Sequence, residues 1–370
     1  MGLTPPPDIS AIGRQFRIAG ELHSAKPITH GHINDTYVGT YHHLGSPRRY
    51  IHQRINHHVF KDPAAVMDNI QRVTTHIRQK LTTAGTRDLD RRVLTLVPTH
   101  AGATHHCTSD GNYWRTYSFI ENAHIHDVVE TPAQAHASAR EYGLFQQLLT
   151  DLPGPRLAET ILDFHHTPKR FAALQRAITQ DAFNRAHTCR TEIDFTLRRQ
   201  PITTVLLDLH RQGAIPERIT HNDTKFNNVM LDDATGEGIC VLDLDTVMPG
   251  LALYDFGDMV RTTTSPTAED ELDLSKVRLE MSMYEALARG YLSTAGGFLN
   301  PAEKQHLAFS GKLITFEIGI RFLTDYLEGD HYFKIHRPAH NLDRCRTQFR
   351  LVESIEQQED AMTRLGALLA

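Results

Sequence analysis

The chain has 370 residues, a formal net charge of −5, and hydrophobic and charged shares of 40% and 22%. This length allows one large domain or two lobes, and the composition is that of an ordinary globular protein. The sequence contains no long basic run, so we expect no nucleic-acid partner. No apolar stretch reaches membrane length, and the N-terminus lacks a signal-peptide pattern. We therefore expect a cytoplasmic monomer with no membrane association.

The first third of the chain has the pattern of a small β-rich lobe. Strands are expected over five segments: residues 21–29, 36–41, 48–55, 91–99 and 113–120. Asp62 and Pro63 predict the start of a helix between the third and fourth strands, as an N-cap followed by a first-turn proline. The apolar positions of this helix form one stripe: Val66, Ile70, Val73 and Ile77.

From about residue 122 onward the pattern is mainly helical. Helices are expected from Pro132 to about Leu149 and from Thr167 onward, each preceded by or starting with a capping residue. The order of elements predicts an α+β, two-lobed, protein-kinase-like fold. In this interpretation residues 1–121 form a small lobe with a five-stranded sheet and one helix, and residues 122–370 form a large helical lobe.

The histidines and cysteines give little functional information. The 24 histidines are scattered without a repeated ligand spacing, and we interpret most of them as solvated surface residues. The four cysteines are far apart and form no CxxC motif, so a disulfide scaffold is not expected.

The residues most relevant to chemistry lie between positions 220 and 246. His221, Asp223 and Asn228 have the spacing H-x-D-x-x-x-x-N, and the following hairpin ends in Asp243. Phosphoryl transfer needs this set, because one carboxylate orients the acceptor hydroxyl while other oxygens bind magnesium. We predict that Asp223 is the base, that Asn228 and Asp243 bind Mg²⁺, and that His221 supports the loop. The alternative is a helix-to-strand turn held by Asx hydrogen bonds.

Three further residues of this region have predicted roles. Lys225 is expected to reach the transferred phosphate. Asp245 would point in the same direction as Asp243 on a continued strand, so it is either a further metal ligand or an ordinary loop carboxylate. The literal D-F-G that begins at Asp255 comes too late to supply the metal ligand. We expect Asp255 to begin the next helix, where it stabilises the helix dipole or binds the backbone of residues 221–228.

Six segments spread over nearly the whole chain carry a family resemblance: residues 31–37, 50–70, 221–232, 241–261, 319–334 and 341–356. They resemble the aminoglycoside phosphotransferase and choline kinase superfamily, and most closely its N-acetylhexosamine 1-kinase branch. The resemblance implies an enzyme that uses ATP and Mg²⁺ to phosphorylate the anomeric hydroxyl of N-acetylglucosamine or N-acetylgalactosamine.

The same resemblance implies contacts with the sugar from two regions of the chain. The residues concerned are His32, Asn34, Asp35, Arg321 and Tyr332. Carboxylates commonly accept hydrogen bonds from neighbouring sugar hydroxyls, and arginine and tyrosine add directional bonds. The alternative is that the first three residues only shape a turn and that the last two are ordinary helix-surface residues.

Nucleotide contacts are expected from Gln53, Arg54 and Glu121. Kinases place a lysine on their third strand, whereas this chain offers Gln53 and Arg54, and we expect Arg54 to bind the phosphates as a fixed cation. Glu121 lies at the expected hinge, beside the predicted adenine position. The helix that follows the third strand has no glutamate to pair with such a cation, so the lysine–glutamate switch of protein kinases is expected to be absent.

Two other functions remain open at this point. The first is another small-molecule kinase of the superfamily, acting on choline, homoserine or an aminoglycoside. The segments "GHIND" and "GIRFLTDY" fit a neutral sugar better than such cationic acceptors. The second is a nucleotide-binding pseudokinase, although every predicted catalytic residue type is present.

Overall fold

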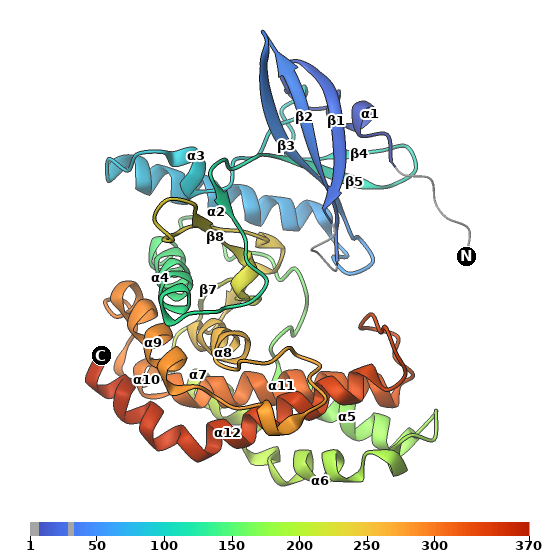
Figure 1. Ribbon diagram of the computed structural model, residues 1–370, viewed down its shortest axis with the longest axis vertical. Helices are drawn as coiled ribbons and strands as arrows, with labels where there is room; N and C mark the ends of the chain where they lie inside the picture. Colours follow the sequence, from blue (N-terminus) through green and yellow to red (C-terminus); the bar gives the residue numbers. More distant parts are fainter. Residues whose placement is uncertain (1–6, 29–32, 370) are drawn as a thin grey trace. The chain divides into compact units, whose positions relative to one another are not determined.

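The computed structural model describes residues 7–28 and 33–369 (Figure 1). The chain forms two compact units. The first contains the residues up to Ala123 together with Asp151–Leu162 and Ile239–Val247, and the second contains His124–Thr150, Asp163–Gly238 and the residues from Met248 onward. The segments 151–162 and 239–247 thus belong to the first unit, although the sequence places them in the C-terminal lobe.

The first unit is built on an antiparallel five-stranded sheet with the order β1-β2-β3-β5-β4. Its strands are β1 (Glu21–Ile28), β2 (Asp35–His43), β3 (Ser46–Ile55), β4 (His106–Cys107) and β5 (Tyr113–Ser118), and its helices are α1 (Ile9–Gly13), α2 (Pro63–Thr83) and α3 (Leu89–Arg92). Figure 1 draws β1, β2 and β3 as the long blue strands. Apolar side chains of α1, of the segment after it and of the sheet share one buried cluster, which includes Ile12, Phe16, Tyr41 and Trp114.

The strand expected over residues 91–99 is absent, and this prediction is wrong. The segment begins in α3 and then runs extended, with only an isolated bridge between Leu96 and Tyr117 and another between Phe16 and Thr99. Pro98 has no N–H to donate to a ladder, which limits regular pairing at this point. The short strand β4 occupies the edge position beside β5 instead.

His52 interrupts the apolar pattern of β3, and the structure gives the reason. Its ring is fully buried, 3.0 Å from the Tyr41 hydroxyl and 2.9 Å from the Thr116 hydroxyl. Burial lowers the pKa of His52 to about 4, so the ring is neutral at physiological pH. It is a satisfied polar group inside the sheet.

Helix α2 joins the inserted segments to the first unit. Asp62 caps it by accepting the Ala65 N–H at 3.0 Å, as expected, and its predicted apolar stripe is buried. On the same helix, the buried Asn69 side chain donates to the carbonyl oxygens of Ala158 (2.8 Å) and Val247 (3.0 Å) and accepts the Ala158 N–H. These bonds explain why segments 151–162 and 239–247 belong to this unit.

The second unit is mainly helical, which confirms the expected α+β class. Its longer helices are α4 (Pro132–Leu148), α5 (Thr167–Gln180), α6 (Arg190–Arg198), α7 (Val205–Arg211), α8 (Ala252–Thr263), α9 (Met281–Ala295), α10 (Pro301–Gln305), α11 (Leu307–Leu327) and α12 (His340–Leu369). Helix α4 packs along α9, and α11 packs along α12 and α8 (Figure 1). Thr131 forms a capping box at the start of α4 with Gln134.

Short elements of the second unit frame the predicted catalytic loop. They are β7 (Arg218–Thr220), η3 (Phe226–Asn228), β8 (Val229–Asp232) and β10 (Met248–Gly250), with β7 and β10 paired antiparallel. Strands β6 (Ala123–His124) and β9 (Gly238–Val241) lie where the chain passes between the units. The remaining 3₁₀ helices are η1 (Ala186–Thr188), η2 (Gln200–Thr204), η4 (Leu244–Thr246) and η5 (Leu274–Lys276).

Two expectations about the whole chain can be compared with the structure. The four cysteines are free thiols, three of them buried. None of the helices formed by residues 7–28 and 33–369 has the length and hydrophobicity needed to cross a bilayer.

Candidate active site

The predicted catalytic loop, residues 221–228, turns sharply between β7 and β8. Asn222 has a positive φ of 66°, a conformation that asparagine adopts more readily than most residues. A carboxylate oxygen of Asp223 lies 2.8 Å from the ammonium of Lys225. Asn228 donates its amide nitrogen to the carbonyl oxygen (2.9 Å) and a carboxylate oxygen (3.2 Å) of Asp223. The loop thus holds a carboxylate, an ammonium and an amide together.

Asp255 supports this loop from helix α8. It is fully buried, and its carboxylate accepts the backbone N–H groups of His221 (2.9 Å) and Asn222 (2.7 Å). The side chain of Gln146 on α4 donates a further bond at 2.7 Å. Helix α8 begins at Ala252, so Asp255 lies in its first turn. Its carboxylate oxygens accept hydrogen bonds from the loop and do not cap α8. That Asp255 does not bind metal stays a prediction.

His221 lies behind the same loop. Its buried ring is 5.5 Å from the ring of Tyr142 and 6.0 Å from that of Phe145, measured between centroids. Its Nδ1 atom lies 3.3 Å from the backbone nitrogen of Asp223. The structure therefore places His221 where it can support the loop, and this role stays a prediction.

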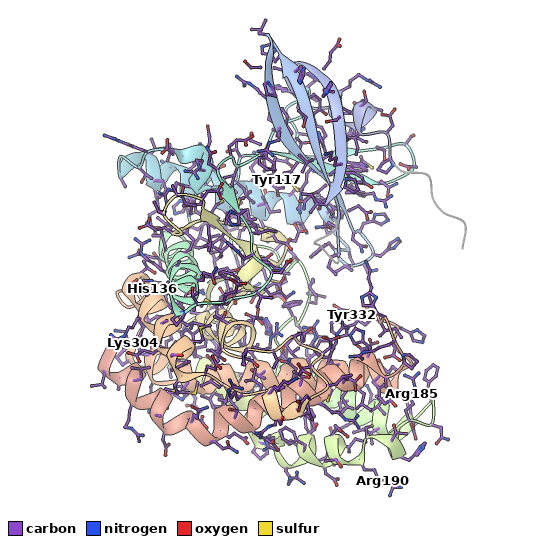
Figure 2. All side chains as sticks on the ribbon, in the orientation of Figure 1. Tyr117, His136, Arg185, Arg190, Lys304 and Tyr332 are labelled. Atoms are coloured by element: carbon purple, nitrogen blue, oxygen red, sulfur yellow. The ribbon has the colours of Figure 1, made fainter. Side chains whose placement is uncertain are left out.

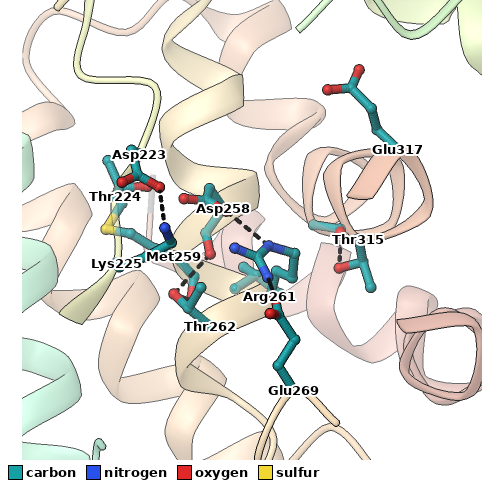
Figure 3. A network of polar contacts seen from close by, with 12 residues as sticks. Asp223, Thr224, Lys225, Asp258, Met259, Arg261, Thr262, Glu269, Thr315 and Glu317 are labelled. Carbon is teal, nitrogen blue, oxygen red and sulfur yellow. Dashed lines mark hydrogen bonds and ion pairs between the residues drawn. The ribbon is translucent and has the colours of Figure 1, made fainter. Parts of the chain in front are cut away.

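A row of charged side chains continues from the loop along α8 (Figure 3). Asp258 accepts a hydrogen bond from Nε of Arg261 at 2.8 Å, and Arg261 also donates to Glu269 at 2.8 Å. Asp258 and Arg261 are buried. The charge of Asp258 acts on Lys225 and that of Arg261 on Asp223. The sequence analysis did not identify these α8 residues.

The ionic states of Asp223 and Lys225 follow from their pairing. Burial opposes charge on both groups, but the charge and the hydrogen bond of Lys225, together with the charge of Arg261 and weaker contributions, lower the pKa of Asp223. For the same reason Asp223 raises the pKa of Lys225. Asp223 is therefore a carboxylate and Lys225 an ammonium at neutral pH. Their side chains are 25% and 42% exposed, so a ligand can reach both.

The segment of the first unit that carries Asp243 and Asp245 departs from the predicted geometry. Strand β9 ends at Val241, and Asp243 has a φ of 52°, which turns the chain into η4. The prediction that Asp245 lies on a continued strand is therefore wrong. Asp245 is 1% exposed, and its two carboxylate oxygens are both bound by the guanidinium of Arg115.

Arg115 is a buried cation that the sequence analysis missed. It lies on β5, and its Nε donates to the side-chain oxygen of Gln53 on β3 at 3.0 Å. Burial opposes its charge, but Asp245 raises the pKa of Arg115. A strand neighbouring β3 therefore carries a fixed cation beside the position where kinases have their lysine. The signal was present in the sequence as a lone arginine within the apolar strand "YWRTYS".

The turn before β2 is bonded to the same aspartate. Asn34 donates to Asp245 at 2.6 Å and accepts the backbone N–H of Asn56 at 3.0 Å. His32, the other polar side chain predicted in this turn, lies outside the described residues. Asn34 thus fixes the turn to η4, and its predicted contact with a substrate stays a prediction.

The remaining predicted residues of the first unit form ion pairs within it. Arg54 donates its Nε to Asp35 at 2.8 Å, and Arg49 does the same to Glu121 at 3.0 Å. Gln53, besides accepting from Arg115, donates to the Thr36 hydroxyl at 3.0 Å. Their roles toward nucleotide and sugar stay predictions.

The residues predicted to contact the acceptor from the helical unit lie together. Arg321 on α11 has its Nη2 atom 3.5 Å from the hydroxyl of Tyr332, and its guanidinium carbon is 5.2 Å from the centroid of the Phe164 ring. Figure 2 labels Tyr332, which is 61% exposed. Asp325 accepts the backbone N–H groups of residues 331–333 at 2.8 to 2.9 Å, which fixes this segment.

The donor atoms present are those that magnesium prefers. Within residues 7–28 and 33–369, no group of three or more histidine, cysteine or acidic side chains could hold a metal by itself. Magnesium in nucleotide sites, however, needs only one or two carboxylates, with the remaining positions filled by phosphate oxygens and water. The amide nitrogen of Asn228 is used in bonds to Asp223, which leaves its oxygen for a metal. Asn228 and Asp243 therefore fit such an ion chemically.

Comparison with known proteins identifies the family. Residues 24–298 match the phosphotransferase enzyme family. Similar solved structures include a microcompartment-associated aminopropanol kinase (14% identity, TM-score 0.61, covering 96% of this chain and 98% of that chain). An aminoglycoside phosphotransferase from Alicyclobacillus acidocaldarius gives 12% identity, a TM-score of 0.61, and coverage of 97% and 98%. Spectinomycin phosphotransferase in complex with ADP and spectinomycin has 11% identity and a TM-score of 0.56, and the match covers 92% of this chain and 94% of that chain. These likenesses show a shared fold.

Proposed function

The chain belongs to the phosphotransferase enzyme family, and we propose that it transfers the γ-phosphoryl group of ATP to the anomeric hydroxyl of an N-acetylhexosamine. The observation that carries the proposal is the loop of residues 221–228. Its carboxylate, ammonium and amide are held together by direct contacts, and Asp255 binds its backbone. Catalysis of phosphoryl transfer depends mainly on such positioning and on electrostatic stabilisation.

In the proposed reaction, Asp223 accepts a hydrogen bond from the acceptor hydroxyl and aligns its oxygen behind the γ-phosphorus. The new O–P bond forms while the bond to the β-phosphate oxygen breaks, and ADP leaves with that electron pair. Asp223 takes the hydroxyl proton as the transfer proceeds, which its ionised state permits. Lys225 moves its ammonium from Asp223 toward the transferring phosphate and neutralises part of the negative charge.

Magnesium, when bound, neutralises phosphate charge and orients the triphosphate. We assign the protein ligands to Asn228 and Asp243 by their chemistry. Asp245 receives no metal role in this proposal, because Arg115 already binds both of its oxygens.

The charges near Arg321 support a neutral acceptor. Burial and the nearby charge of Arg321 lower the pKa of Arg170. Two guanidinium groups in one region disfavour cationic acceptors such as choline and aminoglycosides. Homoserine, the third acceptor of the rival interpretation, is a zwitterion, and the acceptor panel below tests it directly. We propose that Arg321 and Tyr332 bond the sugar, because a hydroxyl or acetamido oxygen is a suitable acceptor for both.

The first unit would supply the nucleotide contacts and the remaining sugar contacts. We propose that Gln53 and Arg54 bind near the phosphates and Glu121 near the adenine. Arg54 would exchange Asp35 for phosphate, which frees the Asp35 carboxylate to join His32 and Asn34 in bonding sugar hydroxyls. Breaking the Arg54–Asp35 ion pair costs little free energy, because both side chains are partly exposed to solvent.

The test is an acceptor panel followed by phosphorus NMR of the product. The panel contains N-acetylglucosamine, N-acetylgalactosamine, choline, homoserine and an aminoglycoside, each measured by ADP release with Mg·ATP. We expect turnover with an N-acetylhexosamine and a phosphate at position one of the sugar. Turnover with a cationic acceptor only, or phosphorylation at another hydroxyl, would overturn the substrate assignment. ADP release that is independent of any acceptor would favour the pseudokinase interpretation.

A further inference from the structure

We propose that His165 and Glu317 form a buried positioning pair that holds the carbonyl group of Asn222, and through it the Asp223 carboxylate, in place for phosphoryl transfer. The inference rests on the proposed role of Asp223 as the base. Neither residue belongs to the catalytic motif. Both lie in the second unit, as does the loop, which His165 contacts directly and Glu317 reaches only through His165.

The first observation is the arrangement of hydrogen-bond partners around the His165 ring. Its Nε2 atom lies 3.0 Å from the carbonyl oxygen of Asn222, and its Nδ1 atom lies 2.8 Å from a carboxylate oxygen of Glu317. A carbonyl and a carboxylate can only accept, so both ring nitrogens donate. The hydroxyl of Thr167 donates to the second carboxylate oxygen at 2.6 Å. The ring is therefore an imidazolium that bridges Glu317 and the loop.

The second observation is burial. The side chains of His165 and Glu317 are 3% and 0% exposed, so their attraction is weakly screened. Burial opposes both charges, but Glu317 raises the pKa of His165, and His165 lowers the pKa of Glu317. The other titratable or charged groups that act on this pair include Asp258 and Tyr254 on α8, Arg321 on α11 and Arg170 on α5.

The third observation is that Asn222 is held from both sides. Its N–H donates to the Asp255 carboxylate at 2.7 Å, and its carbonyl accepts from the His165 imidazolium. A positive φ costs a non-glycine residue some free energy, although less for asparagine than for most residues, so contacts on both sides of Asn222 help to hold it. An anion on the N–H side and a cation on the carbonyl side do so here. Because Asp223 is the next residue, its direction depends on this restraint.

The pair also shares a helix with a predicted acceptor contact. Glu317 and Arg321 lie four residues apart on α11, and residues at this spacing share one helix face. Figure 3 labels Glu317 on this helix, in the same close-up as Asp223 and Asp258. One rigid element therefore carries both the loop support and the residue proposed to bond the sugar.

The experiment compares two variants of the pair with a matched control in the full-length protein. His165→Gln removes the positive charge, and Glu317→Gln removes the negative partner while keeping the ring. Glu192→Gln is the control, because Glu192 on α6 is also buried and also forms an ion pair, with Arg346 at 2.6 Å. For each variant, kcat, the KM values for Mg·ATP and acceptor, and Tm are measured, with Asp223→Asn as the reference for loss of the base.

We expect kcat to fall on the order of tenfold to a hundredfold in His165→Gln and Glu317→Gln, as for loss of a charged hydrogen bond that positions a catalytic group. The KM for Mg·ATP should stay within about twofold of wild type, because neither substitution removes a group proposed to bind the nucleotide. Glu192→Gln should lower Tm by less, because Arg346 is 37% exposed, and it should leave kcat unchanged. If His165→Gln does not fold, Glu317→Gln tests the same claim with the ring in place.

Two results separate this inference from the proposed function. If Asp223→Asn is inactive while His165→Gln and Glu317→Gln retain wild-type kcat, the positioning role is wrong and the base assignment stands. If Asp223→Asn is fully active, the base assignment itself is wrong. A kcat loss in Glu192→Gln equal to that in Glu317→Gln would also overturn the inference, since the effect would then reflect general destabilisation.

Discussion

Asp245 in the first unit and Asp255 in the second are both buried aspartates, but they are stabilised differently. Asp245 faces a cation, the guanidinium of Arg115, and also accepts from Asn34. Asp255 faces neutral donors: two backbone N–H groups and the amide of Gln146. Both lie within fifteen residues of Asp243 in the sequence, and their letters alone do not distinguish them.

The difference shows two ways in which protein groups can satisfy a buried carboxylate. A cation binds Asp245 and fixes η4 and the turn at Asn34 to the sheet of the first unit. Backbone dipoles bind Asp255 and fix the conformation of residues 221–223. Asp255, the first residue of the D-F-G sequence, therefore supports the backbone of residues 221–223 in this structure. Asp245 instead links η4 to the sheet and to the turn at Asn34. The variants below test this contrast through the free energy of unfolding.

Arg115→Met should have the largest effect on stability. It leaves Asp245 buried without its cation, and breaking such a pair costs about 3 to 5 kcal/mol of unfolding free energy. Denaturant unfolding measures this loss. The double variant Arg115→Met/Asp245→Leu should recover more than about half of it, since removing both charges is nearly neutral in many buried pairs. A double variant as unstable as the single one would contradict the ion-pair account.

Asp255→Asn should cost less, roughly 2 to 3 kcal/mol, because the amide keeps one acceptor oxygen for the loop N–H groups. It should also lower kcat, since the backbone of His221 and Asn222 loses part of its support. Thermal unfolding and steady-state kinetics on the same preparation check both statements. Loss of metal-dependent nucleotide binding with no loss of stability would instead indicate that Asp255 is a metal ligand.

The difference in unfolding free energy between wild type and Asp255→Asn should depend on pH. Burial raises the pKa of Asp255, so the folded protein keeps this proton at a pH where the unfolded chain has lost it. Between the ordinary pKa and the raised one, the folded state binds more protons, and its stability falls as pH rises. Wild type should therefore gain stability relative to Asp255→Asn as pH is lowered from 7 toward about 4.5. A Tm difference that narrows on acidification would contradict the raised pKa.

Gln146→Met should have the smallest effect of the series. It removes one neutral donor to Asp255 and the acceptor of the Tyr291 hydroxyl, which now donates to Gln146 at 2.6 Å. The two loop N–H groups remain, so we expect a loss of roughly 1 to 2 kcal/mol. A loss larger than that of Arg115→Met would reverse the proposed ranking of cationic and neutral partners.

Local sequence signals predicted most of the fold and the motif. The Asp62 and Thr131 caps, the apolar stripe of α2 and the three long strands follow from short-range rules, and the structure contains them. Asp223 and Asn228 are only five residues apart, so a short-range pattern was enough to predict that they lie in one loop. The strand expected over residues 91–99 is absent because a short apolar run resembles a strand even where Pro98 prevents a continuous ladder.

Long-range partners could not be read from the sequence. Arg115 and Asp245 are 130 residues apart, and His165 and Glu317 are 152 apart, so no spacing rule connects them. The sequence signalled only that a charge lies in an apolar setting, as Arg115 does in β5 and Glu317 in α11. Which partner satisfies that charge depends on tertiary packing.

The central claim is that Asp223 is the base of a phosphotransfer reaction, and Asp223→Asn tests it most directly. The measurement is kcat with the best N-acetylhexosamine, together with the Kd for Mg·ATP on the same protein. Kcat should fall roughly a thousandfold, while the Kd stays within about threefold, because the substitution removes proton acceptance and leaves the other groups in place. Turnover within about tenfold of wild type would contradict the claim, since loss of a general base costs at least a hundredfold.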